Sequence, residues 1–216
     1  MKLAVFDCDG TMVDGQASIC DAMESAFAET GLPSPDRNAV RRAVGLSLVQ
    51  AARRLVPEAD DATCLAITDA YKRAFRKARE EGKLSQPLYD GIPELLGELR
   101  DRGWQLGVAT GMSDRGLTHC LASHGLDGHF VTLQTADRHP SKPHPAMLEA
   151  ALFEAVVQPA EAVMIGDTTF DMEMARASGV RAIGVEWGYH GPDELIAAGA
   201  DYIATTPRQL RDYLLS

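Results

Sequence analysis

The stretch LAVFDCDGT, residues 3–11, decides the fold, because it joins an apolar run to a turn rich in acid. Leu3–Phe6 is short and fully apolar, which is typical of a strand covered on both faces. Asp7 and Asp9 follow at its end, and Gly10 lets the backbone bend sharply. Open α/β sheets bind ligands beyond the carboxyl ends of their strands, so we expect a functional site at this turn.

Working outward from this turn, a helical segment interrupts the chain before the strands resume. Residues 15–87 carry apolar residues at helical spacing, with stops such as Gly31, Gly45 and Gly82. From residue 88 onward, short apolar runs alternate with helices, and we expect strands at 104–109, 130–133, 162–165, 182–186 and 202–204. This alternation predicts an α/β parallel-sheet core of residues 1–14 and 88–216, split by an all-helical cap of residues 15–87 inserted after the first strand.

Charge and composition exclude several classes of partner. The net charge is −10 over 216 residues, whereas nucleic acid and anionic membranes require a basic surface. Residues 14–87 contain 11 basic and 11 acidic residues, so the whole negative excess lies in the expected core. No run is long enough to span a membrane, and no signal peptide precedes the first strand, so we expect a cytoplasmic protein with reduced cysteines.

The two acids of the first turn can divide the work of ester hydrolysis. The carboxylate of Asp7 can act as a nucleophile that forms a covalent acyl phosphate, which water then hydrolyses. Asp9 can give a proton to the leaving alkoxide and later take one from the attacking water. An Asp-rich turn that merely caps a helix is the alternative interpretation.

Three further groups at strand ends or in loops complete the expected site. Thr110 and Gly111 end the next core strand, where a hydroxyl and free backbone N–H groups can hold phosphoryl oxygens. Lys142 lies in a loop that three prolines restrict, and a held ammonium can neutralise nucleophile and phosphate. Asp167 and Asp171 flank a strand–helix junction and offer hard oxygen ligands suited to Mg²⁺.

Together these groups resemble the motifs of the haloacid dehalogenase superfamily of phosphohydrolases, in the order that the family shows. The helical segment directly after the first motif is similar to the small-cap branch, typified by phosphoglycolate phosphatases. The matching positions are Asp7–Thr11, Thr110, Gly111, Lys142, Asp167 and Asp171.

The resemblance implies a Rossmann-like core, with Asp7 as nucleophile and Asp9 as general acid and base. It implies Mg²⁺ held by the Asp7 side chain, the Asp9 backbone carbonyl and Asp167, with Asp171 assisting. It also implies that Thr110, Gly111 and Lys142 bind the phosphoryl group. The expected enzyme is therefore a phosphoric monoester hydrolase that needs Mg²⁺.

In the cap, Arg41, Arg42, Gly45, Leu46 and Ser47 fall where such enzymes often place a specificity loop. The two arginines could meet a substrate carboxylate by paired hydrogen bonds. Alternatively, Gly45 only stops one helix and Ser47 only caps the next.

The expected substrate is a small soluble phosphomonoester, because a lid of about seventy residues can close over the site and exclude water. A 2-phosphoglycolate-like carboxylated phosphate comes first and a phosphosugar second, with no nucleic acid or membrane partner, in a monomer or homodimer. Three alternatives stay open: a phosphosugar mutase, a haloacid dehalogenase and a non-catalytic binding module. Asp9 and Asp167 speak against the dehalogenase, which needs neither a second Asp nor Mg²⁺, and the full set of catalytic groups speaks against the binding module.

Overall fold

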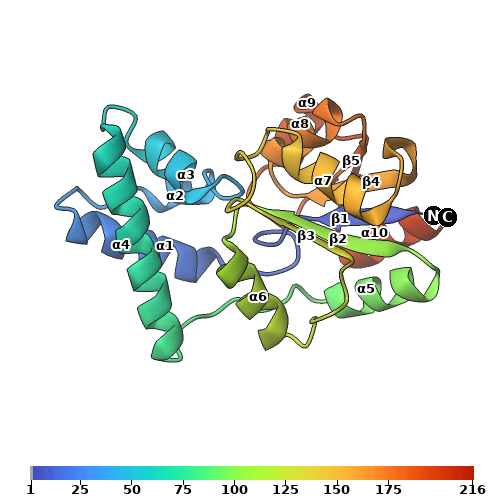
Figure 1. Cartoon of the computed structure of the whole chain (residues 1–216), viewed down its shortest axis with the longest axis horizontal. Helices are drawn as coiled ribbons and strands as arrows, with labels where there is room; N and C mark the ends of the chain where they lie inside the picture. The colour runs from blue at the N-terminus through green and yellow to red at the C-terminus, as the bar shows by residue number, and fades with distance from the viewer. Residues whose placement is uncertain (1) are drawn as a thin grey trace.

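The computed structural model describes residues 2–216 and is built around a six-stranded parallel sheet (Figure 1). The strand order β3-β2-β1-β4-β5-β6 places β1 between β2 and β4. The strands are β1 Leu3–Phe6, β2 Gln105–Thr110, β3 Thr132–Thr135, β4 Ala162–Gly166, β5 Arg181–Val185 and β6 Tyr202–Ala204. The carboxyl ends of the strands that precede Asp7, Gly111 and Asp167 are therefore neighbours.

Helices cover both faces of the sheet, and the period-two alternation of β1 shows why both must be apolar. Ala4 and Phe6 pack with α5 Ile92–Asp101, α6 Asp114–Ser123 and α10 Pro207–Leu215. Leu3 and Val5 face the opposite way. They pack with the layer of α7 Ala146–Ala155, α8 Thr169–Ala177 and α9 Pro192–Ala197; a short 3-10 helix, η1 Pro159–Glu161, precedes β4.

Four helices between β1 and α5 form a separate unit, which we call the cap. They are α1 Gln16–Glu29, α2 Arg37–Arg41, α3 Leu48–Leu55 and α4 Asp61–Glu80. The cap has an apolar core of its own, in which residues such as Phe27, Ala52 and Ile67 are buried. It lies beside the sheet, next to the end where β1 and β2 finish (Figure 1). The predicted α/β fold with a parallel-sheet core and an inserted helical cap is confirmed; the domain bounds at residues 14–15 and 87–88 stay a prediction.

One predicted strand lies at a different position. The apolar run at 130–133 predicted a strand there, but β3 is Thr132–Thr135, paired with β2 from Gly107↔Thr132 onward. Thr132 and Gln134 are buried, and both donate hydrogen bonds to the carboxylate of Glu154 on α7, at 2.6 and 2.8 Å. The structure thus pairs buried polar side chains with a distant acid, which a local apolar pattern does not reveal.

Within residues 2–216, no helix combines the length and the apolar character that crossing a membrane requires.

Candidate active site

Asp7 stands at the carboxyl end of β1, where the turn that follows is tightly held. Its backbone N–H donates to the carbonyl of Ile165 on β4, at 2.8 Å. The side chain is 1% exposed; Nζ of Lys142 lies 2.9 Å from its Oδ1, and no donor from the described residues reaches its Oδ2. Burial raises the pKa of Asp7 to about 6, although the charge of Lys142 opposes this shift. A buried carboxylate oxygen without a donor marks a group that can accept a ligand.

Lys142 is fully buried and lies between two carboxylates. Its Nζ is 2.9 Å from Oδ1 of Asp7 and 2.6 Å from Oδ1 of Asp171. Burial alone lowers the pKa of Lys142, but the charges of Asp171 and Asp7 outweigh it and leave that pKa raised. The ammonium therefore stays charged beside Asp7, as the role predicted for Lys142 requires.

Asp171 is positioned by the first turn of α8. Its Oδ2 accepts hydrogen bonds from the Thr168 hydroxyl at 2.7 Å and from the Thr168 backbone N–H at 3.1 Å, and its Oδ1 contacts Lys142. A Cβ at Gly166 would collide with the Asp171 side chain, so this close approach depends on glycine. Both oxygens of Asp171 are thus engaged in fixing Lys142 and capping the helix.

Asp167 is fully buried and faces the first turn. Its Oδ1 accepts from the Thr11 hydroxyl at 2.8 Å, and its Oδ2 accepts from the Tyr189 backbone N–H at 2.9 Å. Burial, and then the negative charge of Asp7, raise the pKa of Asp167 well above its usual range. Two buried carboxylates this close can both carry a charge when a cation lies beside them.

Carboxylate oxygens of Asp7, Asp167 and Asp171 lie within 4.8 Å of one another, and all three residues are buried. A single ammonium, that of Lys142, is paired with this cluster. Because Mg²⁺ prefers carboxylate oxygens and retains water or substrate ligands, these residues fit a magnesium ion. Asp167 and Asp171 each have hydrogen-bond donors at both carboxylate oxygens, so Oδ2 of Asp7 is the oxygen of this cluster without a donor among the described residues.

The Asp9 side chain is directed away from this cluster. It is half-buried, lines the cavity between cap and core, and its Oδ1 accepts a hydrogen bond from Gln86 Nε2 at 3.3 Å. Burial, and then the charge of Asp7, raise the pKa of Asp9 to about 7. A carboxyl group that titrates near neutral pH can both give and take a proton. No motif pointed to Gln86, which lies in the segment that returns from the cap to the core.

Thr110 and Gly111 line the same cavity as the two aspartates, at the end of β2. The Thr110 hydroxyl accepts a hydrogen bond from the Met112 backbone N–H at 3.3 Å. A Cβ added at Gly111 would come 2.7 Å from the carbonyl oxygen of Gly45, so the glycine allows the cap loop to approach. The predicted phosphate-binding pair therefore lies at the contact between cap and core.

The predicted specificity residues of the cap separate into two groups. Gly45, with φ +93°, and Leu46 line the cavity, whereas Arg41 and Arg42 do not. Arg42 pairs instead with Glu194 on α9, its Nη1 donating to Oε2 at 2.6 Å.

Ser47 stands at the start of α3 without a capping hydrogen bond from its side chain. Its backbone N–H donates to the Ser141 hydroxyl, at 2.8 Å. The contacts of Arg42 and Ser47 thus join the cap to the core.

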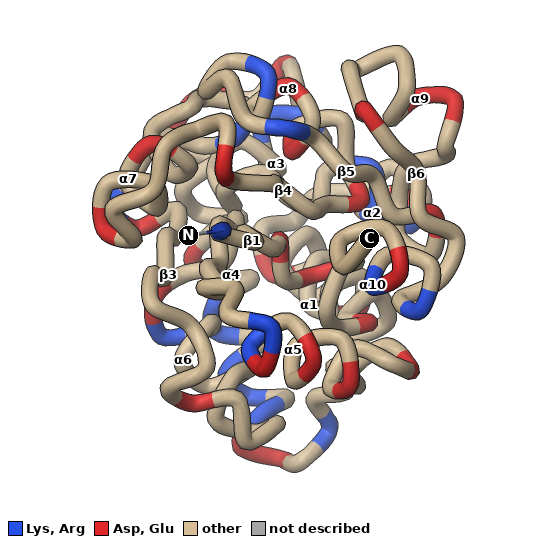
Figure 2. The backbone as a smooth tube through the Cα atoms, turned by 90° about the vertical axis from the view of Figure 1, so that its right-hand side faces the viewer, with Lys and Arg blue, Asp and Glu red and all other residues tan. Residues whose placement is uncertain are grey.

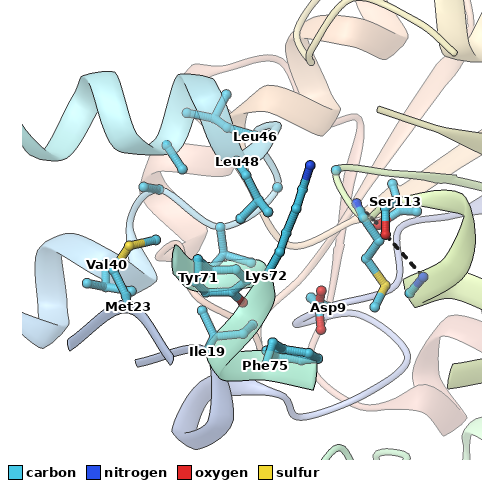
Figure 3. Close-up of a pocket in the computed structure, with 18 of the residues that line it drawn as sticks. Asp9, Ile19, Met23, Val40, Leu46, Leu48, Tyr71, Lys72, Phe75 and Ser113 are labelled. Atoms are coloured by element: carbon cyan, nitrogen blue, oxygen red, sulfur yellow. Dashed lines mark hydrogen bonds between the residues drawn. The ribbon is translucent and has the colours of Figure 1, made fainter. Parts of the chain in front are cut away.

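The cavity itself measures about 190 Å³ and opens between the cap and the strand ends. Figure 3 shows apolar side chains of the cap, among them Ile19, Tyr71 and Phe75, across from Asp9 and Ser113. Four cations that the sequence did not single out also line it: Lys72, Arg76 and Arg79 on α4, and Arg115 on α6. The spacing 72, 76 and 79 predicts a shared helix face, but not that this face meets the core.

The loop between β5 and α9 contacts the backbone around the site. Trp187 Nε1 donates to the backbone carbonyl of Thr11 at 3.0 Å, which fixes the turn after the nucleophile. His190 Nδ1 accepts from the Thr169 backbone N–H at 3.1 Å, at the start of α8. His190 therefore helps to fix the loop geometry at the start of α8.

Known proteins place these features in a family. Residues 4–185 match the family described as haloacid dehalogenase-like hydrolase. A relative named probable phosphatase IndB, from Dickeya dadantii, is 36% identical over 94% of this chain and 89% of its own length. A phosphoglycolate phosphatase from Vibrio vulnificus is 27% identical over 100% of this chain and 96% of its own.

A solved structure agrees with this placement across the whole molecule. The crystal structure of a predicted phosphatase from Clostridium acetobutylicum superposes with a TM-score of 0.89, at 26% identity, over 99% of this chain and 98% of that one. The buried acids, the central lysine and the helical cap thus occur in a chain that matches one family along most of its length. The chain belongs to the haloacid dehalogenase-like hydrolases, as its motif order predicted.

Proposed function

We propose that this chain is a phosphatase that hydrolyses a small phosphomonoester through an aspartyl-phosphate on Asp7, with the aid of Mg²⁺. One observation carries the proposal: the Asp7 carboxylate is buried, its Oδ1 lies 2.9 Å from the Lys142 ammonium, and its Oδ2 has no hydrogen-bond donor among the described residues. Relatives named as phosphatases support the hydrolytic outcome. The cation supplies charge neutralisation between nucleophile and phosphate when it is bound.

In the first step, an oxygen of Asp7 attacks phosphorus and the bond from phosphorus to the leaving oxygen breaks. Lys142 Nζ, 2.9 Å from Asp7, lowers the repulsion between the two anions. Thr110 and Gly111, at the end of β2, are placed to hold the phosphoryl oxygens. Asp9, protonated in part at neutral pH because its pKa is about 7, gives its proton to the leaving alkoxide.

In the second step, water attacks the phosphorus of the aspartyl-phosphate. The Asp9 carboxylate takes a proton from that water, the bond from phosphorus to the Asp7 oxygen breaks, and inorganic phosphate leaves. The general acid of the first step thus becomes the general base of the second, and the enzyme returns to its starting state.

The substrate we propose is a small soluble phosphomonoester. The enzyme itself we propose to be cytoplasmic, a monomer or a homodimer, with no nucleic acid or membrane partner. Contacts from Gly45 to Gly111 and from Ser47 to Ser141 bring the cap over the site, which favours a substrate small enough to be enclosed. Carboxylated phosphates typified by 2-phosphoglycolate come first and phosphosugars second. Relatives named phosphoglycolate phosphatase and N-acetylmuramic acid 6-phosphate phosphatase support these two classes.

The test is steady-state kinetics of phosphate release with purified protein and Mg²⁺. The panel compares kcat/KM for 2-phosphoglycolate, hexose phosphates, a nucleoside monophosphate and a phosphopeptide. We expect a small metabolite to be preferred and the phosphopeptide to be poorest. A phosphopeptide that is hydrolysed best would contradict enclosure by the cap, and an isomerised product without released phosphate would point to a mutase.

A further inference from the structure

The cavity beside Asp9 has an apolar wall that a very small substrate would leave without contact. The wall comes from the cap and includes Ile19 and Met23 of α1, Leu48 of α3, and Tyr71 and Phe75 of α4 (Figure 3). Tyr71 and Phe75 stack with ring centroids 5.5 Å apart, so they present a continuous surface. Apolar surface of this extent is stabilised when a ligand displaces water from it.

The same cavity carries a group of unbalanced cations. Lys72, Arg76 and Arg79 occupy successive turns of α4, and Arg115 lies in the first turn of α6. Within residues 2–216, no carboxylate pairs with any of these four side chains. Among residues 2–216, the acidic residues that line the cavity are Asp7 and Asp9, and both belong to the proposed hydrolytic site.

Arg79 is the cation most committed to the cavity. Its Nε is buried and has no hydrogen-bond partner among the described residues, whereas the side chains of Lys72, Arg76 and Arg115 are exposed. Burial lowers the pKa of Arg79, and the nearby charges of Arg115 and Arg76 lower it further. The charge of Glu80 opposes this shift without reversing it. A buried donor without an acceptor, with two like charges nearby, is stabilised by an anion that binds there.

We propose that the leaving alcohol of the substrate has an apolar body, which packs on the cap wall, and a second anionic group at its far end, a carboxylate bound by Arg79 with Arg76 and Arg115. This inference rests on the proposed phosphatase function and specifies its substrate class. The substrate is therefore a carboxylated phosphate with a longer apolar spacer than glycolate has. In this proposal the substrate carboxylate is bound by arginines of α4 and α6 and not by Arg41 and Arg42.

The experiment compares two esters that differ at the far end alone, hexyl phosphate and ω-carboxypentyl phosphate, with 2-phosphoglycolate as the short reference. We expect wild-type kcat/KM for the carboxylated ester to exceed that for hexyl phosphate by about tenfold or more, the size of one charge-assisted hydrogen bond. Arg79→Ala should bring the kcat/KM values of the two esters within about twofold of each other, because the loss falls mainly on the carboxylated ester. Arg115→Ala, on the opposite wall, should reduce the same preference in part.

Arg73→Ala is the matched control, because Arg73 lies on α4 but pairs with Glu29 at 2.6 Å and does not line the cavity. It should preserve the preference, and circular dichroism should show the same fold for all variants. Equal wild-type rates on the two long esters would overturn the inference, as would a preference that survives both Arg79→Ala and Arg115→Ala. Faster turnover of 2-phosphoglycolate than of ω-carboxypentyl phosphate would contradict the proposal that the substrate has a longer apolar spacer than glycolate. If wild type hydrolyses no ester, including p-nitrophenyl phosphate, the phosphatase proposal fails as well.

Discussion

At the scale of single residues, the site uses burial to keep charges reactive. Asp7, Asp167 and Lys142 are at most 1% exposed, so water screens none of them. The carboxylates therefore depend on Lys142 and on a bound cation for their charged state. Replacing Asp7 or Asp9 by Asn removes one charge and keeps the shape of the side chain, and we expect a different kinetic effect from each substitution.

Asp7→Asn removes the attacking charge and keeps the shape of the side chain. Because the bond to phosphorus forms at Asp7, kcat should fall by at least about 10³-fold, as losses of catalytic nucleophiles do. Phosphate release from freshly purified protein measures this. Lys142 retains Asp171 as a partner at 2.6 Å, so the variant should remain folded by circular dichroism. Turnover within about tenfold of wild type would refute Asp7 as the nucleophile.

Asp9→Asn should act in a way that depends on the leaving group. An alkyl phosphate needs a proton as its alkoxide departs, whereas p-nitrophenolate departs without one. The variant should therefore lose turnover of an alkyl phosphate in the first step. With p-nitrophenyl phosphate it should show a burst of nitrophenol followed by slow hydrolysis of the aspartyl-phosphate. Stopped-flow absorbance detects the burst, and equal losses on both substrates without a burst would count against Asp9.

At the scale of elements, the sequence predicted what local patterns encode. Apolar runs that end near Asp7, Thr110 and Asp167 predicted three strands, because side-chain period and terminal acids are local signals. The structure adds that these strands are neighbours, since β1 pairs with both β2 and β4. The predicted position of β3 was wrong, because the strand includes buried Thr132, whose hydroxyl needs the carboxylate of Glu154 from another element as its hydrogen-bond acceptor.

The cap shows the same limit of local reasoning. The roles of Arg42 and Arg79 depend on which face of each helix meets the core. Helical spacing predicts the faces of an element but not the partner that each face finds. Arg42 pairs with Glu194 across the interface between cap and core, whereas Arg79 lines the cavity.

The Arg42–Glu194 pair should hold the cap closed, and Glu194→Gln should weaken it. Hydrogen bonding from Arg42 lowers the pKa of Glu194 to about 2, so the pair is charged at neutral pH. Glu194 is 42% exposed, so the free energy at stake is about 0.2–1 kcal/mol. We expect KM to rise about two- to fivefold with kcat within twofold, and the effect to shrink at high salt. Asp193→Asn on the same helix is the control. An equal rise in KM for that variant would contradict the role of the Arg42–Glu194 pair in holding the cap closed.

At the scale of the whole molecule, acid is concentrated where the cation would bind. The net charge is −10, and residues 14–87 contribute none of it, so the core carries the excess (Figure 2 shows both signs along the backbone). Three aspartates of this core have folded-state pKa values above their usual 3.8: Asp7 at about 6, Asp9 at about 7, and Asp167 well above that usual value. Their charged forms therefore oppose folding unless a cation is present.

The sign of the pH dependence follows from these pKa values. A carboxyl group whose folded-state pKa is raised binds its proton more tightly when folded, so its protonated form favours the native state. That contribution is complete below about pH 4 and is lost as the pH rises through about 6 for Asp7 and 7 for Asp9. One pKa unit is worth about 1.4 kcal/mol, so the shift of Asp7 from 3.8 to about 6 contributes on the order of 3 kcal/mol.

Thermal unfolding between pH 5 and pH 8, with EDTA or with millimolar Mg²⁺, tests this balance. In EDTA, the Tm of wild type should fall with rising pH more steeply than that of Asp7→Asn, because the variant cannot acquire the buried charge. Mg²⁺ should raise the Tm more at pH 8 than at pH 5, since its ligands must be deprotonated to bind it. Ca²⁺ should also raise the Tm but restore less turnover, because its longer and looser coordination misplaces nucleophile and phosphate. An increase in Tm with Mg²⁺ that does not depend on pH, or that is as large in Asp7→Asn as in wild type, would show that the cation binds away from the buried aspartates.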